Sequence, residues 1–271
     1  MSTAKVSTKT SAKISAEGVV VRLGGNLVVD GVTLALKAGE LAVLIGPNGA
    51  GKTTLIRAFA GLIPAEGRIA IEGRSLASLA AHDRARRIAY LPQGHAFHWP
   101  MTVAAVVALG RYPHGDVFSG VTDADRVAVE RALVATDALP FAARSVTELS
   151  GGERARVALA RALASEAPIL MADEPTTSLD PRHQLAVMAL LANIAHGGTA
   201  VLAIVHDLAL AARFADRLLV MDQGRLVAEG APREVLTRER IAAVFAVEAE
   251  IIDSAAGPLP ILQRPIDGAS R

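Results

Sequence analysis

The chain has 271 residues, with 28 Lys and Arg against 27 Asp and Glu, so its formal net charge at neutral pH is +1. This balance leaves no broad positive field to hold nucleic acid by counterion release, and aromatic residues for base stacking are only 3% of the chain. The absence of Cys excludes disulfides, thiolate metal sites and cysteine nucleophiles. Although 51% of the residues are hydrophobic, no uninterrupted apolar run approaches the roughly 20 residues that cross a bilayer.

The N-terminal segment combines Lys5, Lys9 and Lys13 with Ser, Thr and Ala. It has neither the apolar stretch of a secretory signal nor the Arg of a mitochondrial presequence. We predict that residues 1–16 form a disordered, solvated tail; contact of its lysines with anionic lipid headgroups is the alternative.

Three short apolar runs have the length and residue types of strands buried on both faces: Leu41–Ile45, Ile169–Ala172 and Thr199–Val205. Such runs are typical of a parallel sheet in an α/β protein. Because ligands bind outside the carboxyl ends of the strands in open parallel sheets, the segments that follow these runs are predicted to converge on one site.

The segment after the first run reads Gly-Pro-Asn-Gly-Ala-Gly-Lys-Thr and fits the phosphate-binding P-loop pattern. Glycines let such a loop wrap phosphates closely, with successive backbone N–H groups pointing inward at the start of a helix. Lys52 would place its charge on the β- and γ-phosphates, and the Thr53 hydroxyl would bind Mg²⁺. The predicted nucleotide-binding residues here are Gly46, Pro47, Asn48, Gly49, Ala50, Gly51, Lys52, Thr53 and Thr54.

The second run leads directly into Asp173 and Glu174. A carboxylate at that strand end can hold Mg²⁺, directly or through water, while the next carboxylate can polarise the attacking water. Alone, an Asp-Glu pair in this position is more often a helix cap or a solvated turn. Together with the P-loop, it predicts Asp173 as a metal ligand and Glu174 as the general base.

Between about residues 94 and 147 the pattern becomes helical, with predicted helices over Val103–Leu109 and Asp123–Leu139. We interpret this region as an insert within a split nucleotide-binding core. The predicted organisation is a tail at 1–16, a core at 17–93 and 154–250, a helical subdomain at 94–153 and a C-terminal extension at 251–271.

A Leu-Ser-Gly-Gly-Glu segment precedes the strong helix formers of Arg154–Ala164. Ser150 and Glu153 can form a capping box, which leaves Gly151 and Gly152 unexplained. Two glycines in the first turn of a helix cost stability unless the backbone must approach another group closely, and an exposed helix N-terminus suits a phosphate.

In this order, the motifs resemble those of the ATP-binding-cassette (ABC) ATPases over residues 17 to about 250. The matching elements are the Walker A loop Gly46–Thr53, the Q-loop glutamine Gln93, the signature Leu149–Glu153, Walker B Ile169–Glu174, the D-loop Ser178–Asp180 and the switch histidine His206. The resemblance implies a RecA-like P-loop NTPase fold of the α/β class. It has a mainly parallel sheet, an N-terminal antiparallel β subdomain and the inserted helical subdomain.

The resemblance also implies an ATPase that uses Mg²⁺ and works as a homodimer. In that family the signature of one subunit closes over the ATP held by the other, so each monomer contains half of each site. The implied signature residues are Leu149, Ser150, Gly151, Gly152 and Glu153. The implied catalytic residues are Glu174 and His206, the metal ligands are Thr53, Gln93 and Asp173, Gln93 also contacts the nucleotide, and Asp180 serves in the D-loop.

Two residues depart from the usual family pattern. Leu23 stands where the family usually has an aromatic residue that stacks on adenine, so packing on the base falls to Leu23 or to the guanidinium of Arg22. Glu153 replaces the commoner Gln of the signature, and we attach no functional change to it.

Further segments are similar to the importers of ferric siderophores, haem and cobalamin. These segments are Leu109–His114, His183–Gln184, Glu234–Thr237 and Val244–Glu250. The alternative is that they are generic helix ends and surface turns shared across importers. An importer implies separate polytopic permease subunits, indirect work with a solute-binding protein, and a peripheral position at the cytoplasmic face of the inner membrane.

Two other classes of protein compete with this interpretation. A soluble ABC ATPase acting on ribosomes or DNA usually has two cassettes or long coiled coil, whereas this chain has one P-loop and no sustained heptads. A GTPase or small-molecule kinase would share the P-loop but would not explain the Leu-Ser-Gly-Gly-Glu segment. We therefore predict no nucleic-acid partner.

Overall fold

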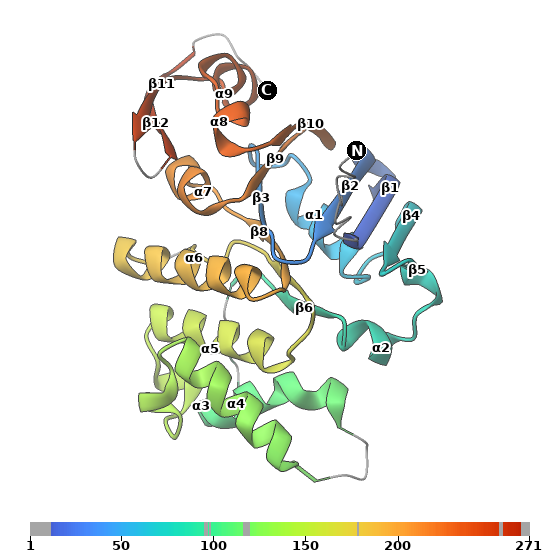
Figure 1. Ribbon diagram of the computed structural model, residues 1–271, viewed down its shortest axis with the longest axis vertical. Helices are drawn as coiled ribbons and strands as arrows, with labels where there is room; N and C mark the ends of the chain where they lie inside the picture. The colour runs from blue at the N-terminus through green and yellow to red at the C-terminus, as the bar shows by residue number, and fades with distance from the viewer. Residues whose placement is uncertain are drawn as a thin grey trace, which may run out of the picture.

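The computed structural model describes residues 12–94, 97, 99–115, 120–177, 179–254 and 257–266. The strands form a six-stranded central sheet, a four-stranded antiparallel sheet and a two-stranded hairpin. In Figure 1 the central sheet runs through the middle of the molecule, with the antiparallel sheet at its side and a group of helices at the opposite end from the hairpin.

The central sheet is parallel except at one edge. Its strands, in spatial order, are β10 (Arg225–Gly230), β9 (Arg217–Asp222), β3 (Leu41–Ile45), β8 (Ala200–Ile204), β7 (Ile169–Ala172) and β6 (Ile88–Leu91). Only β10 pairs antiparallel with its neighbour. The three predicted runs are adjacent here as β3, β8 and β7, and every residue of these strands is buried.

Alternate side chains of the central strands enter two separate cores. In β3, Leu41, Val43 and Ile45 join the core on one face, whereas Ala42 and Leu44 join the core on the other. This two-sided burial explains why the strands read as continuous apolar runs. Helices α6 (Pro181–His196), α7 (Leu208–Phe214), α8 (Pro232–Val235) and α9 (Arg238–Phe245) contribute to the first core.

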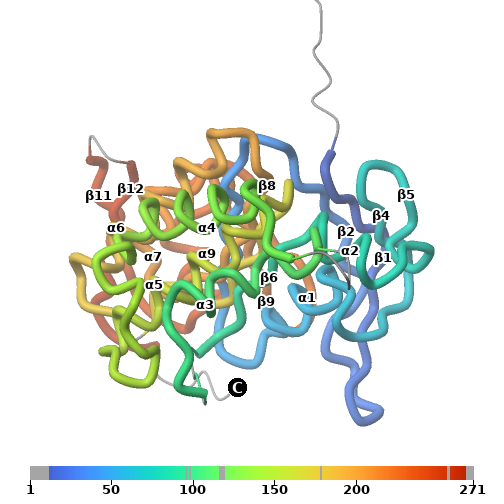
Figure 2. Tube along the Cα trace, turned by 90° about the horizontal axis from the view of Figure 1, so that it is seen from below, coloured from blue at the N-terminus to red at the C-terminus, as the bar shows by residue number. Residues whose placement is uncertain are grey.

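The second core lies between the central sheet, helix α1 (Lys52–Phe59) and the antiparallel sheet. That sheet has the order β2 (Asn26–Lys37), β1 (Ala12–Leu23), β4 (Glu66–Ile71) and β5 (Arg74–Ser75). Two short helices, η1 (Leu76–Ser78) and α2 (Ala81–Ala85), lead from it to β6. The predicted antiparallel N-terminal β subdomain is confirmed, and Figure 2 shows its strands gathered at one side of the molecule.

The predicted tail extends too far into the chain. Strand β1 begins at Ala12 and pairs with both β2 and β4, so residues 12–16 are strand rather than disordered tail. Ile14 and Ala16 are buried because alternate positions of the strand face the core. The rest of the predicted tail, residues 1–11, lies outside the described residues.

The helical part contains α3 (Val103–Ala108), η2 (Leu109–His114), α4 (Asp123–Ala135), η3 (Leu139–Phe141), η4 (Val146–Glu148) and α5 (Gly151–Ala164). Helix α4 is shorter than predicted because the chain turns at Asp137, which has a φ of +52°. Helix α5 packs one side into a helical core with α3 and α4 and the other side into the core of the central sheet. The predicted boundary at 153/154 therefore falls inside a continuous helix shared by both parts.

The predicted C-terminal extension is an antiparallel hairpin of β11 (Val247–Ser254) and β12 (Gly257–Pro265). It begins before residue 251, and β12 lies beside α7. In the part of the chain that the structure describes, every helix is too short or too polar to cross a membrane.

Candidate nucleotide-binding and catalytic site

The P-loop joins the carboxyl end of β3 to α1 and lies tightly against two other strands. An added Cβ would be 2.1 Å from the carbonyl oxygen of Met221 at Gly46, and 2.6 Å from that of Val28 at Gly51. Both glycines also have positive φ, 153° and 95°. Gly49 has a φ of 79°, but an added Cβ there would meet nothing within 4 Å. Gly46 and Gly51 therefore fix the loop against β9 and β2, whereas Gly49 only shapes the turn.

A cavity of about 210 Å³ lies along the P-loop. Its lining residues are Val28, Asn48, Gly49, Ala50, Gly51, Lys52, Thr53, Thr54 and Glu174. The structure thus brings most of the predicted nucleotide-binding residues together with the predicted general base. Gly46 and Pro47 are not among the lining residues, but their carbonyl oxygens accept hydrogen bonds from Lys52.

Lys52 is held inside the loop and is only 6% exposed. Its Nζ donates to the carbonyl oxygens of Gly46 and Pro47, at 2.8 and 2.9 Å. Burial lowers the pKa of Lys52, and the negative charges of Glu174 and Asp173 oppose this effect. Because the bonded partners are neutral carbonyls, the ammonium charge remains available to a phosphate.

The predicted metal ligands Asp173 and Thr53 are in contact. Asp173 is fully buried, and its Oδ1 accepts from the Thr53 hydroxyl at 3.0 Å. Its Oδ2 accepts from the Tyr90 hydroxyl at 3.2 Å, and that hydroxyl accepts from Arg57 Nε at 3.4 Å. Burial raises the pKa of Asp173, and the hydrogen bonds from the two hydroxyls oppose the rise. Sequence reasoning missed Tyr90 and Arg57, because no motif marks a partner that topology alone brings to a carboxylate.

Glu174 is surrounded by three hydrogen-bonding groups. Its Oε1 lies 2.6 Å from His206 Nε2, and its Oε2 accepts from Gln93 Nε2 at 2.7 Å and from Thr177 Oγ1 at 3.0 Å. Burial acts to raise the pKa of Glu174, but the bonds from His206 and Thr177 and the charges of His206 and Lys52 outweigh it, so the pKa is lowered. Glu174 is therefore ionised at neutral pH.

Glu174 also has an unusual backbone. Its φ of +53° lies in the left-handed region, where non-glycine residues are uncommon and strain concentrates at functional sites. Thr177 is the partner that the sequence could have revealed, since a hydroxyl three residues after a carboxylate is within reach across a turn. Gln93 contacts Glu174 rather than the Thr53–Asp173 pair, and its role in metal binding stays a prediction.

The signature residues form the start of α5. Ser150 is the N-cap, and the predicted capping box is confirmed: Glu153 N donates to Ser150 Oγ at 3.3 Å and Ser150 N donates to Glu153 Oε2 at 2.8 Å. An added Cβ would meet nothing within 4 Å at Gly151 and only an ordinary contact, 3.7 Å from Leu179, at Gly152. Packing within the described chain therefore gives no reason for glycine at these positions.

The remaining predicted residues lie at the ends of elements. Asp180 is the N-cap of α6 and accepts from the backbone N–H of His183 at 3.0 Å. Ser178, the first residue of the predicted D-loop, lies outside the described residues. Leu23 is 45% exposed at the end of β1, where it pairs with Asn26. An apolar side chain is therefore available at the position of the missing aromatic residue.

Comparisons with known proteins place this chain in a family. A family model described as ABC transporter matches residues 29–177, more than half of the chain. The hemin import ATP-binding protein HmuV of Nocardia farcinica is 46% identical over 246 residues, which cover 89% of this chain and 85% of that protein. The cobalamin import ATP-binding protein BtuD of Halobacterium salinarum is 44% identical over 251 residues, 92% of this chain. The match covers 63% of BtuD, so this chain spans less than two thirds of that relative's length.

Solved structures give the same fold. An inward-facing ABC transporter described as of a metal-chelate type has a TM-score of 0.79 at 24% identity, with 93% of this chain and 97% of that chain covered. A dimeric ATP-binding cassette bound to ADP and phosphate has a TM-score of 0.72 at 28% identity, with 81% of this chain and 99% of that chain covered. The predicted P-loop NTPase fold is confirmed.

Proposed function

Because this chain belongs to the ABC transporter family, we propose that it is the subunit that binds and hydrolyses ATP to drive import through separate membrane subunits. One observation carries the proposal. Glu174, fixed by three hydrogen-bonding groups, lines the same cavity as the P-loop, so a carboxylate faces the place where the loop would hold the phosphates.

In this proposal, the P-loop N–H groups and Lys52 bind the phosphates of ATP. Glu174 orients the attacking water and accepts its proton, as an ionised carboxylate can. His206 and Gln93 hold the two oxygens of Glu174 and so set the direction in which it faces. Hydrolysis thus depends on a carboxylate that is held by side chains following β8, β6 and β7.

The donor set beside the P-loop fits Mg²⁺. Thr53 and Asp173 offer hard oxygen ligands in contact with one another. Among the described residues, no three His, Cys, Asp or Glu side chains gather into a metal cluster. That sparse set suits an ion that keeps several waters and binds substrate phosphates. Bound Mg²⁺ would neutralise charge on the phosphoryl oxygens, with Thr53 and Asp173 as its protein ligands and Gln93 as a further candidate.

We also propose that two copies form the working unit. Gly151 and Gly152 have no packing requirement within the described chain, yet glycine there lets a ligand approach the N-terminus of α5. The signature residues do not line the P-loop cavity of their own chain. A second copy would let the signature, from Leu149 to Glu153, close on ATP held by its partner, with Asp180 near the same interface. The similar cassette with ADP and phosphate is dimeric.

The proposed cargo is haem, cobalamin or a ferric siderophore. The hemin and cobalamin import proteins named above support this class, as do the segments Leu109–His114 and Val244–Glu250. The chain would then sit peripherally at the cytoplasmic face of the inner membrane. Polytopic permease subunits would carry the cargo, with a solute-binding protein as an indirect partner.

Copurification tests this assignment. Tagged Glu174→Gln chain would be isolated in detergent with MgATP, and the associated proteins would be identified by mass spectrometry, with Lys52→Ala as a nucleotide-binding control. We expect a polytopic permease, retained more by Glu174→Gln than by Lys52→Ala. Recovery of ribosomal or DNA-repair proteins in place of a permease would contradict the transport function and leave ATP hydrolysis standing.

A further inference from the structure

Helix η2, residues Leu109–His114, lies unusually close to the signature helix α5. An added Cβ at Gly110 would lie 2.1 Å from the carbonyl oxygen of Arg161, so only glycine allows this approach. The two elements therefore meet through their backbones, and polar side chains that follow Gly110 reach the end of α5.

Arg111 makes most of these polar contacts. Its side chain is only 11% exposed, and its Nε donates to Asp125 Oδ1 at 2.8 Å. Its Nη1 donates to the carbonyl oxygen of Ala164 at 2.8 Å and to Glu166 Oε2 at 2.9 Å. One guanidinium thus joins the first turn of α4, the last carbonyl of α5 and the turn that follows α5. Hydrogen bonds from Arg111 and Thr122 hold the pKa of Asp125 far below its usual range.

Two further hydrogen bonds tie the same segment to its surroundings. His114 Nε2 lies 2.7 Å from the carbonyl oxygen of Ser165, and Arg86 Nε donates to the carbonyl oxygen of Pro113 at 2.7 Å. Arg86 lies just before β6, so this bond reaches the core, whereas η2 belongs to the helical part. We call Arg86, Arg111, His114 and Glu166 the clasp.

The turn held by the clasp leads directly to the catalytic strand. Residues 165–168 connect α5 to β7, which ends immediately before Asp173 and Glu174. Glu166 has a φ of +50°, a left-handed conformation that a non-glycine residue adopts at some cost. Ion pairs from Arg111 and Arg131 reach the side chain of Glu166 in this turn.

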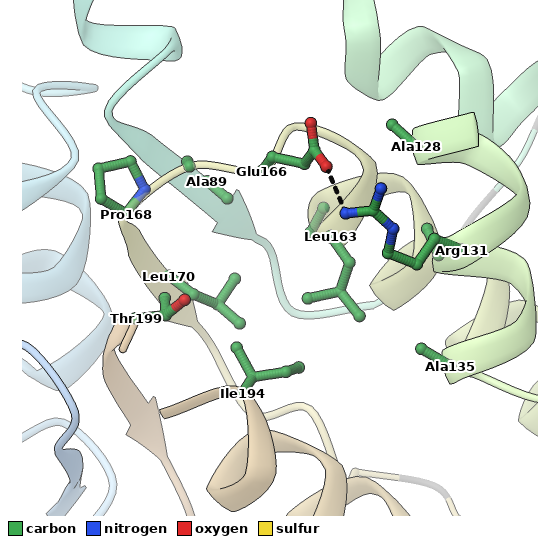
Figure 3. A pocket seen from close by; sticks show the side chains of 13 residues that line it. Ala89, Ala128, Arg131, Ala135, Leu163, Glu166, Pro168, Leu170, Ile194 and Thr199 are labelled. Atoms are coloured by element: carbon green, nitrogen blue, oxygen red, sulfur yellow. Dashed lines mark hydrogen bonds and ion pairs between the residues drawn. The ribbon is translucent and has the colours of Figure 1, made fainter. Parts of the chain in front are cut away.

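Apolar packing beside the clasp is incomplete. A cavity of about 360 Å³ lies between helices α4 and α5 on one side and β6, β7 and the end of α6 on the other. Six of its thirteen lining residues are alanines, which are Ala89, Ala128, Ala132, Ala135, Ala162 and Ala167. Figure 3 shows Arg131 reaching across this space to Glu166. The Nη1 of Arg131 lies 3.1 Å from Oε1 of Glu166. This space is open to solvent on one side and lined by many small side chains, so the two parts make fewer dispersion contacts across it than they would across a filled core.

We propose that Arg111 is a positioning residue for ATP hydrolysis. Through Ala164 and Glu166 it fixes the turn between α5 and β7, and so it sets the position of the signature helix relative to the Walker B carboxylates. The proposal rests on the proposed function of Glu174 as the general base. It assigns to η2 a role in the catalytic geometry, beyond that of a surface turn.

Arg111→Lys and Glu166→Gln test the clasp in complementary ways. Lys keeps the positive charge but lacks the fork that binds Asp125, Ala164 and Glu166 together. Glu166→Gln leaves the Arg111–Asp125 pair intact and weakens the ion pairs by which Arg111 and Arg131 hold the turn. Arg126→Met is the matched control, because Arg126 is an exposed Arg on the same helix as Asp125 and, among the residues that the structure describes, forms its ion pair with exposed Asp123.

Three quantities would be measured on each full-length chain: kcat for ATP, the Kd for MgATP and hydrogen exchange of the amides at 165–172. We expect both clasp variants to lose about tenfold in kcat, since small displacements of reacting groups have effects of that order or larger. We expect the Kd to stay within about twofold, because the P-loop is untouched, and exchange at 165–172 to accelerate. Arg126→Met should match the wild type in all three.

Unchanged kcat and unchanged exchange in both clasp variants would overturn the proposal. A parallel loss of MgATP affinity and kcat would also overturn it, because that pattern indicates general unfolding rather than positioning. Failure of the proposed function is distinguishable: the wild type itself would then bind MgATP without hydrolysing it, while hydrogen exchange would still report on the clasp.

Discussion

Glu174 Oε1 lies 2.6 Å from His206 Nε2, so the side chain that follows β8 directly orients the carboxylate that follows β7. His206→Ala removes one of the three groups that hold Glu174. We expect kcat for ATP to fall by about 10- to 100-fold, the scale of a misplaced general base, with little change in the Kd for MgATP. Steady-state kinetics and equilibrium nucleotide binding measure the two effects. His196→Ala, an exposed His beside Asp216, is the control; wild-type turnover in His206→Ala would contradict the assignment.

Tyr90→Phe removes a single hydroxyl, the one that donates to Asp173 Oδ2 at 3.2 Å. Mutation of a residue that hydrogen-bonds a metal ligand commonly lowers metal affinity by 10- to 100-fold. We therefore expect the Mg²⁺ concentration for half-maximal nucleotide binding to rise by about tenfold. Binding of ATP without Mg²⁺ should not change, because the P-loop is intact. Fluorescence titration with Mg²⁺ separates the two, and Tyr112→Phe, at a side chain 80% exposed, is the control. Equal loss with and without Mg²⁺ would show that Tyr90 acts only on the fold.

Two P-loop glycines should respond differently to alanine. In Gly46→Ala the new Cβ would lie 2.1 Å from a backbone carbonyl oxygen, so we expect a loss of about 2 kcal/mol or more in the free energy of unfolding, and loss of ATP binding. In Gly49→Ala the new Cβ would have no neighbouring atom within 4 Å. We therefore expect the free energy of unfolding to fall only by the cost of a left-handed alanine, about 1 kcal/mol. Urea denaturation and ATP binding would be compared; similar stability of the two variants would contradict the packing argument.

The central strands were predictable because burial on both faces leaves a direct mark on the sequence. Leu41–Ile45 and Ile169–Ala172 correspond to β3 and β7 residue for residue. The P-loop could be predicted because the chemistry of phosphate binding requires specific residues at fixed spacing. The start of β1 was missed because Ala12, Ile14 and Ala16 alternate with polar residues too weakly to distinguish a strand from a tail.

Contacts between distant segments could not be predicted in the same way. Tyr90 reaches Asp173 because β6 pairs with β7, and Arg111 reaches Glu166 because η2 packs on α5. Neither pair has a spacing in the sequence that indicates contact, since tertiary packing sets both. The α4 boundary was missed for a different reason: Asp137 adopts a left-handed turn without the glycine that usually indicates one.

Glu153 gives the signature helix a pH-dependent stability. The backbone N–H and hydroxyl of Ser150 lower the pKa of Glu153 in the folded chain from its ordinary value of 4.5. Because the pKa is lower in the folded chain, ionised Glu153 stabilises the fold at any pH above its pKa in the unfolded chain. This stabilisation disappears as the pH falls through the pKa of Glu153 in the folded chain. We expect Glu153→Gln to be about 0.5 kcal/mol less stable than wild type at neutral pH, a difference that vanishes in acid. Urea denaturation without nucleotide from pH 7 downward measures it; a difference independent of pH would contradict the charge argument.

In the proposed mechanism, Glu174 is the general base for ATP that is bound between two copies of this chain. Light scattering of Glu174→Gln with MgATP, combined with an assay of its turnover, tests both the base and the dimer. We predict a stable dimer that retains two ATP per dimer, with turnover reduced at least about 100-fold. Turnover equal to wild type, or a chain that remains monomeric with ATP bound, would contradict it.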